Sequence, residues 1–190
     1  MKLATLALAL GLASPVFAAA PLSVDFEKNW NYGDEVANTY AANGVTFTNV
    51  LGLSNDANFS YFSGAPSPLG VAFVQLDGIT NTTAYMNVAG GVAGGLSFYA
   101  STTADFQVKA YSGLNGSGTL LGTFTVAANT TDYSVWSQKV ITFNGVAQSF
   151  DLSSANNVAV LDNIAAVPEP GSLALMLAGA TVLLARRRRG

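Results

Sequence analysis

The chain contains neither cysteine nor histidine among its 190 residues. Without cysteine it has no disulfide framework, no thiolate nucleophile and no cysteine-ligated zinc site. Without histidine it lacks the usual general base near neutral pH and the commonest metal ligand, which excludes Ser-His-Asp triads and HExxH-type sites. Side-chain packing, with at most a bound ion, must therefore hold the fold together.

Charged residues are also scarce, at 10% of the chain, and they are unevenly distributed. Half of the eight basic residues are Arg186–Arg189 at the C-terminal end. The body from residue 19 to residue 167 has three lysines against ten carboxylates, and so a net charge of −7. A negative body repels phosphate backbones and offers no basic patch, which excludes nucleic acid as a partner.

Residues 1–18 have the organisation of a secretory signal peptide. Lys2 gives a short basic start, an apolar run follows from Leu3 to Leu12, and small residues precede a predicted cleavage site after Ala18. The alternative, a buried N-terminal helix of a cytosolic protein, leaves this combination unexplained. We therefore predict that the chain enters the secretion translocon and loses residues 1–18.

The C-terminal residues 166–190 have the organisation of a second targeting segment. Val167-Pro168-Glu169-Pro170 precedes an apolar run, Leu173–Ala185, and the arginine cluster Arg186–Arg189. The prolines prevent helix formation and leave an extended backbone that a processing enzyme can bind. As a helix, the apolar run rises about 20 Å, short of a hydrocarbon core of about 30 Å, but arginines reach headgroups and stay on the cytoplasmic side. We predict a short transmembrane helix with the preceding domain facing outward.

This order of Pro-Glu-Pro, short membrane helix and arginine cluster resembles the PEP-CTERM sorting signal of Gram-negative bacteria, a segment also known as an ice-binding protein C-terminal domain. The resemblance implies recognition by an exosortase, a membrane transpeptidase-like enzyme. It implies a transient stay in the inner membrane, removal of the tail, and delivery to the cell surface or to the exopolysaccharide of a biofilm matrix. The sorting signal would be Val167, Pro168, Glu169, Pro170 and Arg186, Arg187, Arg188 and Arg189, with Glu169 as the recognition element. The alternative is an ordinary membrane anchor that is never cleaved.

Residues 19–165 are expected to form one all-β domain. Apolar and polar residues alternate at Val24–Glu27, Val45–Thr48, Phe106–Ala110 and Thr123–Val126, which predicts strands with one buried face. About ten short strands at spacings of roughly 8–12 residues favour a β-sandwich, with a jelly roll as the expected topology.

Turn signals separate the predicted strands. Asn144-Gly145 lies between Val140–Phe143 and Val146–Phe150, which predicts a two-residue hairpin. Asp77-Gly78 and the glycine-rich segment Ser112–Gly118 are further hairpin candidates.

Close carboxylates are the only candidates for acid–base chemistry. Asp25 and Glu27 share one face of a strand, as two glycosidase carboxylates would need to share a cleft. Evenly spread carboxylates and the lack of histidine favour a non-enzyme, so a small glycoside hydrolase is the less favoured alternative. No cofactor is required.

A calcium ion is the one metal that the composition favours, because hard cations take carboxylate and carbonyl oxygens. By analogy with sandwich-type carbohydrate-binding modules, in which an ion joins the first strand to the last, Asp25, Glu27 and Asp162 would be its ligands. The alternative is a solvated acidic edge that discourages strand-to-strand aggregation.

Aromatic residues near the N-terminus suggest carbohydrate contacts. Trp30, Tyr32, Tyr40 and Tyr61 could stack on sugar rings while neighbouring amides bind hydroxyls, although burial in the core is the alternative for each. Trp136 alternates within a predicted strand and is expected in the core. Threonine clusters show no regular repeat, which disfavours an ice-binding face.

We therefore predict an exported, exosortase-processed surface or matrix protein with a structural or adhesive role. The alternative function is a carbohydrate-binding module, with or without calcium.

Overall fold

The computed structural model describes residues 22–54, 62 and 64–167. This part is mostly β-sheet, with short 3-10 turns and no α-helix within the described ranges. Among these residues no helix is long and apolar enough to cross a membrane. The predicted signal peptide at residues 1–18 and the predicted transmembrane helix at Leu173–Ala185 lie outside the described residues.

Nine strands and three 3-10 helices follow one another along this part of the chain. They are β1 (Ser23–Val24), η1 (Ala41–Asn43), β2 (Val45–Thr48), β3 (Val50–Ser54), β4 (Gly70–Val74), β5 (Tyr85–Thr102), β6 (Phe106–Tyr111), η3 (Leu114–Gly116), β7 (Leu120–Val126), β8 (Ser137–Asp151), η4 (Ser153–Ala155) and β9 (Ala159–Val167).

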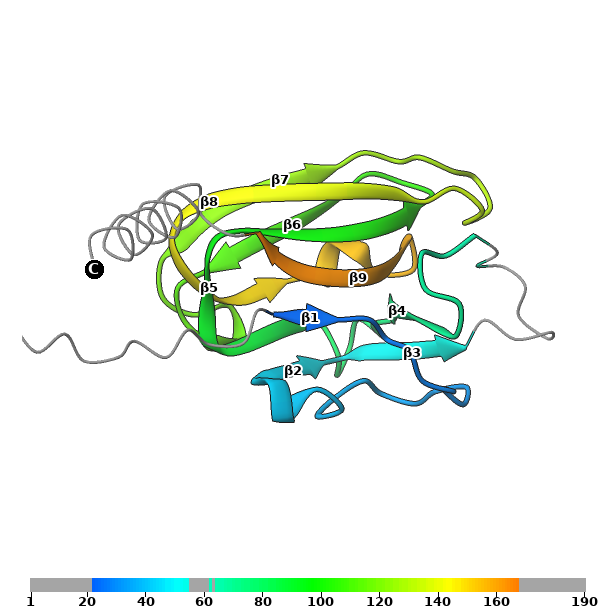
Figure 1. Ribbon diagram of the computed structural model, residues 1–190, viewed down its shortest axis with the longest axis horizontal. Helices are drawn as coiled ribbons and strands as arrows, with labels where there is room; N and C mark the ends of the chain where they lie inside the picture. The colour runs from blue at the N-terminus through cyan, green and yellow to red at the C-terminus, as the bar shows by residue number, and fades with distance from the viewer. Residues whose placement is uncertain (1–21, 55–61, 63, 168–190) are drawn as a thin grey trace, which may run out of the picture.

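Two long strands, β5 and β8, take part in two layers and curve through the molecule in Figure 1. The start of β5 pairs with β2, and the end of β8 pairs with β6, which in turn pairs with β7. The end of β5 pairs instead with β9, which pairs with β4 and β1, while β4 pairs with β3. This arrangement confirms the predicted all-β, sandwich-like fold.

The main core lies between the two layers. In one layer Phe47, Met86 and Phe150 are neighbours across β2, β5 and β8, and all three are buried. In the other layer Ala72 of β4 lies beside Leu161 of β9, and both are buried. Each buried aliphatic or aromatic side chain contributes about 1.5–3 kcal/mol relative to exposure. The alternation predicted at residues 45–48 is confirmed, because Phe47 lies inside and Thr48 outside.

A second apolar cluster covers the other face of β3, β4 and β9. Phe62, Val71 and Val160 are its buried members, and Trp136 is half-buried against them. Val71 and Val160 directly precede the main-core residues of β4 and β9, so alternation along each strand serves both clusters.

The hairpin predicted at Asn144-Gly145 is wrong. Strand β8 continues through this dipeptide, and Gly145 has a φ of 94°. Its pairing with β5 is irregular nearby, between Ala93 and Gly95. A glycine with positive φ can serve a bulge as well as a two-residue turn, and here Gly145 lies where β8 passes from one layer to the other.

The other two hairpin candidates have different outcomes. Asp77-Gly78 follows β4, which pairs with β3 and β9 and not with the next strand, so the predicted hairpin is wrong. Ser112–Gly118 joins β6 to β7, which pair antiparallel, and this hairpin is confirmed.

Candidate functional site

Asp162 of β9 is a buried carboxylate at the junction of β9 with the segment before β4. Its side chain is 0% exposed. Its Oδ2 accepts a hydrogen bond from the Ser67 N–H at 2.9 Å, and its Oδ1 accepts one from the Asn163 N–H at 2.7 Å. The Ser67 hydroxyl lies 2.8 Å from both carboxylate oxygens and 3.0 Å from the backbone oxygen of Asp25.

Glu27 and Asp25, in the segment after β1, also contact this junction. Strand β1 ends at Val24, and Glu27 then turns back toward the start of β4. Its Oε1 accepts hydrogen bonds from the N–H of Leu69 at 2.8 Å and of Gly70 at 3.2 Å. Asp25 is exposed, and its Oδ1 lies 3.3 Å from the Tyr40 hydroxyl. Asp162 and Glu27 therefore bind the segment 67–70 through their carboxylates, whereas Asp25 reaches it only through its backbone oxygen.

Burial dominates the electrostatics of this junction. It raises the pKa of Asp162 to about 6, and the negative charge of Glu27 adds to this, although hydrogen bonds from Ser67 and Asn163 act in the opposite direction. Burial also raises the pKa of the Tyr40 phenol above its usual range, with the charge and hydrogen bond of Asp25 as further causes.

The junction does not fit a preformed calcium site. Within residues 22–54, 62 and 64–167, no three aspartate, glutamate, histidine or cysteine side chains gather as a metal-binding group. The Ser67 hydroxyl already lies where a cation held by both oxygens of Asp162 would sit. Calcium needs roughly six to eight oxygen ligands. Asp25, Glu27 and Asp162 serve here as hydrogen-bond acceptors, and calcium binding by them stays a prediction.

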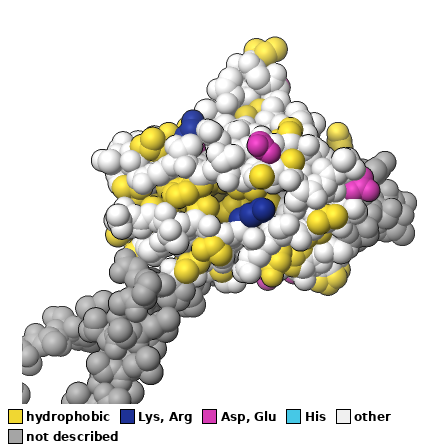
Figure 2. All heavy atoms as spheres, turned by 90° about the horizontal axis from the view of Figure 1, so that it is seen from above, with side chains coloured by type: hydrophobic (Ala, Val, Ile, Leu, Met, Phe, Trp, Pro, Cys, Tyr) yellow, Lys and Arg dark blue, Asp and Glu magenta, His cyan; other side chains and the backbone are white. Residues whose placement is uncertain are grey.

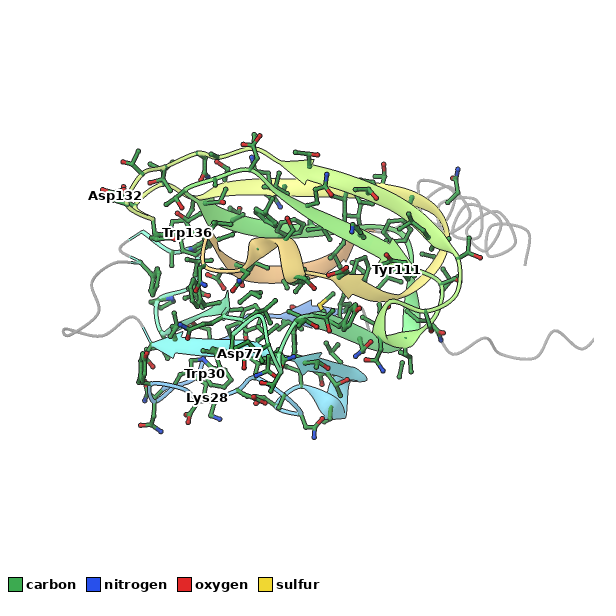
Figure 3. All side chains as sticks on the ribbon, turned by 180° about the vertical axis from the view of Figure 1, so that it is seen from behind. Lys28, Trp30, Asp77, Tyr111, Asp132 and Trp136 are labelled. Atoms are coloured by element: carbon green, nitrogen blue, oxygen red, sulfur yellow. The ribbon has the colours of Figure 1, made fainter. Side chains whose placement is uncertain are left out.

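Trp30 lies in the main core with 6% of its surface exposed. Its indole Nε1–H donates to the backbone oxygen of Phe26 at 2.9 Å. The ring lies against Gly52 and Gly70, where any added Cβ would overlap it. On its outer side the Lys28 Nζ lies 4.5 Å from the ring centroid, and Figure 3 places the two side chains together. No broad ring face is left for a sugar.

The other predicted carbohydrate contacts differ in exposure. Tyr40 is half-buried and packs edge-on against Phe26 and Phe47, with ring centroids 5.8 and 6.4 Å apart. Tyr32 is 81% exposed and can present its ring to a ligand. Tyr61 lies outside the described residues.

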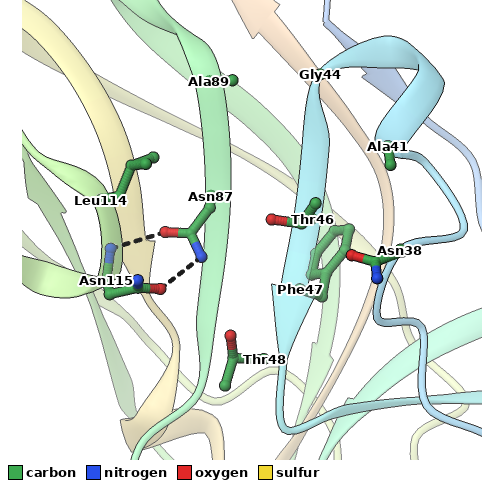
Figure 4. A pocket seen from close by; sticks show the side chains of 10 residues that line it. All are labelled: Asn38, Ala41, Gly44, Thr46, Phe47, Thr48, Asn87, Ala89, Leu114 and Asn115. Carbon is green, nitrogen blue, oxygen red and sulfur yellow. Dashed lines mark hydrogen bonds between the residues drawn. The ribbon is translucent and has the colours of Figure 1, made fainter.

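A groove of about 360 Å³ lies beside β2 and the start of β5, bounded by η1 and η3. Its polar lining residues are Asn38, Thr46, Thr48, Asn87 and Asn115, and its apolar ones include Ala41, Phe47, Ala89 and Leu114. Figure 4 shows Asn87 and Asn115 joined by two hydrogen bonds at one side of the groove, with Thr46 and Thr48 on the neighbouring strand β2.

Sequence reasoning missed this groove because its parts are distant in the chain. Asn87 and Asn115 are 28 positions apart, and the turn signal at Ser112–Gly118 gives no indication that Asn115 lies beside Asn87. The signal that could have indicated one side of it was the alternation that places Thr46 and Thr48 on the outer face of β2.

Residues 166–189 match a known family, the PEP-CTERM protein-sorting motif. The match begins within β9, whose last residue is Val167. Pro168, Glu169, Pro170 and Arg186–Arg189 fall within the matched segment but outside the described residues. No curated protein matches the chain.

Several solved structures are similar in shape at low sequence identity. The K1 cleaved adhesin domain of Lys-gingipain from Porphyromonas gingivalis is 14% identical with a TM-score of 0.49, over 79% of this chain and 99% of that one. A carbohydrate-binding module of Cellvibrio mixtus lichenase 5A, in complex with cellotriose, is 10% identical with a TM-score of 0.44, over 78% and 98%. A xylan-binding domain from Paenibacillus barcinonensis is 14% identical with a TM-score of 0.41, over 80% and 97%. The family match is the finding that bears on function: the chain carries a PEP-CTERM sorting motif at residues 166–189.

Proposed function

We propose that this chain is an exported protein that an exosortase releases from the inner membrane to the cell surface or the extracellular polysaccharide. The sorting motif at residues 166–189 is the observation that carries the proposal. The predicted signal peptide at residues 1–18 supplies entry to the translocon, and the predicted helix at Leu173–Ala185 supplies a transient anchor. The role of the released domain is structural or adhesive.

The position of the motif supports this order of events. The matched segment starts at residue 166, and β9 ends at Val167. Loss of everything after Val167 would therefore leave all nine described strands in place. The membrane segment and the arginine cluster would be discarded without any change in the core.

The surface of the described part also suits a polysaccharide environment. In Figure 2 charged side chains are few on the face shown, and apolar and uncharged polar groups cover most of it. Uncharged amides and hydroxyls exchange hydrogen bonds with sugar hydroxyls without a large cost of desolvating charge.

The proposal is tested by intact mass and fractionation of the protein from its host, with and without the exosortase. We expect an extracellular species that has lost residues 1–18 and the tail beyond the Pro168–Pro170 region. Glu169→Ala should leave the full tail in the inner membrane, whereas Glu35→Ala, at an exposed carboxylate of the body, should be processed normally. A tail that is retained in the wild type would overturn the proposal.

Carbohydrate binding is a second candidate function, favoured by the exposed ring of Tyr32 and by the amide and hydroxyl groove beside β2. Retention of the mature protein on polysaccharide from its own host tests it. Failure to bind this material would remove the candidate and leave the sorting proposal intact.

A further inference from the structure

We propose that the groove beside β2 binds a neutral carbohydrate, as the specific site for the carbohydrate-binding function proposed above. None of the ten residues that line it is charged. Its volume of about 360 Å³ falls within the range of about 300–1,000 Å³ that is usual for ligand sites. Such a site suits a short stretch of an uncharged sugar chain.

The two asparagines on one side of the groove are held in fixed orientations. Asn87 Nδ2 donates to Asn115 Oδ1 at 2.8 Å, and the backbone N–H of Asn115 donates to Asn87 Oδ1 at 2.8 Å. Asn87 is only 8% exposed. Because both amides are already ordered, a ligand that binds them does not have to supply the entropy cost of ordering them.

The loop that carries Asn115 is itself anchored to the sheet. The Ser149 hydroxyl accepts a hydrogen bond from the Gly116 N–H at 2.9 Å and donates one to the Gly113 oxygen at 2.6 Å. Asn115 has a φ of 53°, a conformation that asparagine tolerates better than most residues. The groove wall is therefore a rigid element built on β8 rather than a free loop.

The part of the groove formed by β2 and by the segment before η1 has hydrogen-bonding groups with spare capacity. The side chains of Asn38, Thr46 and Thr48 line the groove and make no hydrogen bond to another residue in the described part of the chain. Their amide and hydroxyl groups can both donate and accept, as sugar hydroxyls do. Leu114 and Ala89 add apolar surface for the C–H face of a sugar ring.

Charge determines which sugars fit. The body has a net charge of −7, so anionic chains such as polyuronates are repelled. A second groove of about 370 Å³ has the carboxylates Glu35 and Asp77 in its lining, and these would repel an anionic chain from that groove. The groove beside β2 has no carboxylate in its lining, which makes a neutral chain its best match.

The test uses the mature protein purified from its host and titration calorimetry with cellohexaose, maltohexaose and mannohexaose. An oligogalacturonate hexamer serves as the anionic counterpart. We expect at least one neutral hexaose to bind. The double variant Thr46→Val, Thr48→Val keeps side-chain shape and strand propensity but removes two hydroxyls, and should weaken binding by about tenfold. Thr125→Val, at an exposed threonine of β7 outside the groove, should bind within about twofold of wild type.

Three results would overturn the inference. Failure of all three neutral hexaoses to bind would exclude a neutral carbohydrate site here. Unchanged affinity in the double variant together with loss of binding in Tyr32→Ala would move the site to Tyr32, with the carbohydrate-binding function retained. Binding of the oligogalacturonate alone would contradict the argument from charge.

Discussion

The Ser67 hydroxyl lies 2.8 Å from both carboxylate oxygens of Asp162, although the two residues are 95 positions apart in the sequence. This contact attaches the segment before β4 to the middle of β9 and leaves a carboxyl group enclosed by the protein. Because the same hydroxyl also reaches the backbone oxygen of Asp25, it ties the chain just after β1 to both elements. Asp162 and Glu27 thus have a structural role at this junction, as acceptors of hydrogen bonds from the segment before β4.

The enclosed carboxyl group makes stability depend on pH. The pKa of Asp162 is raised to about 6 by burial, above the value of about 3.9 expected in the unfolded chain. The folded state therefore favours the protonated acid, so the Asp162 contribution is fully present below about pH 4 and is lost as pH rises through about 6. We expect the unfolding free energy of the wild type minus that of Asp162→Asn to fall over this window, as measured by urea denaturation. A difference that is constant or rises with pH would contradict the assignment.

Calcium should have little effect on the folded domain. The Ser67 hydroxyl lies where a cation bound by both oxygens of Asp162 would sit. We therefore expect the melting temperature to agree within about one degree in millimolar calcium and in a chelator. Differential scanning calorimetry measures this directly. A rise of several degrees that is lost in Asp162→Asn would instead support calcium binding by Asp25, Glu27 and Asp162.

Gly52 is required for the burial of Trp30. A Cβ at this position would overlap the indole ring, so Gly52→Ala should lower the free energy of unfolding by about 1–3 kcal/mol. Gly90→Ala is the matched control, because nothing lies within 4 Å of a Cβ added there. Equal stability of the two variants in chemical denaturation would argue against the packing described for Trp30.

The two tryptophans should respond differently to replacement by phenylalanine. Trp30 donates its N–H to Phe26, whereas the buried Nε1 of Trp136 has no hydrogen-bond partner in the described part of the chain. Trp30→Phe removes one of the two donors to the Phe26 oxygen, which keeps the Lys28 N–H at 2.8 Å, while Trp136→Phe removes an unsatisfied N–H. We expect Trp30→Phe to be the more destabilising by about 0.5–1.5 kcal/mol in equilibrium unfolding. The reverse order would contradict these assignments.

Processing of the tail should be limited by its closeness to the sheet. Val167 pairs with Gly95, so no linker separates β9 from Pro168. An enzyme that binds an extended peptide must break the last backbone pairs between β9 and β5, or bind next to the edge of the folded domain with little free chain to grip. A Gly-Ser-Gly-Ser insertion after Val167 should therefore speed conversion of precursor to mature protein in pulse-chase labelling. The same insertion after the exposed Gly78 is the control, and equal rates in both would contradict the prediction.

Local patterns predicted the individual strands better than their connections. The alternation at residues 45–48 gave the correct faces of β2, because a half-buried strand leaves a direct trace in the sequence. Asn144-Gly145 led to a wrong hairpin prediction because a residue with positive φ suits both a turn and a bend within a strand. Only the long-range pairing of β8 with β5 distinguishes these two structures.

The sites were predicted unevenly for the same reason. The sorting motif is contiguous, so its residues could be recognised from order alone. The burial of Trp30 depends on glycines in β3 and β4, and the groove depends on a loop placed beside β2, which are tertiary relationships. No local signal distinguishes an asparagine in such a groove from one in an ordinary turn.

The central position of β9 has a mechanical consequence. Backbone hydrogen bonds join β9 to β4 and β1 along one edge and to β5 along the other. A pulling force applied at Val167 acts along β9 and across these bonds, so both rows share the load in shear. An outer strand such as β7, which pairs with β6 alone among the described strands, would peel away one bond at a time. Tension on the C-terminal end is therefore borne by a strand that is hydrogen-bonded along both of its edges.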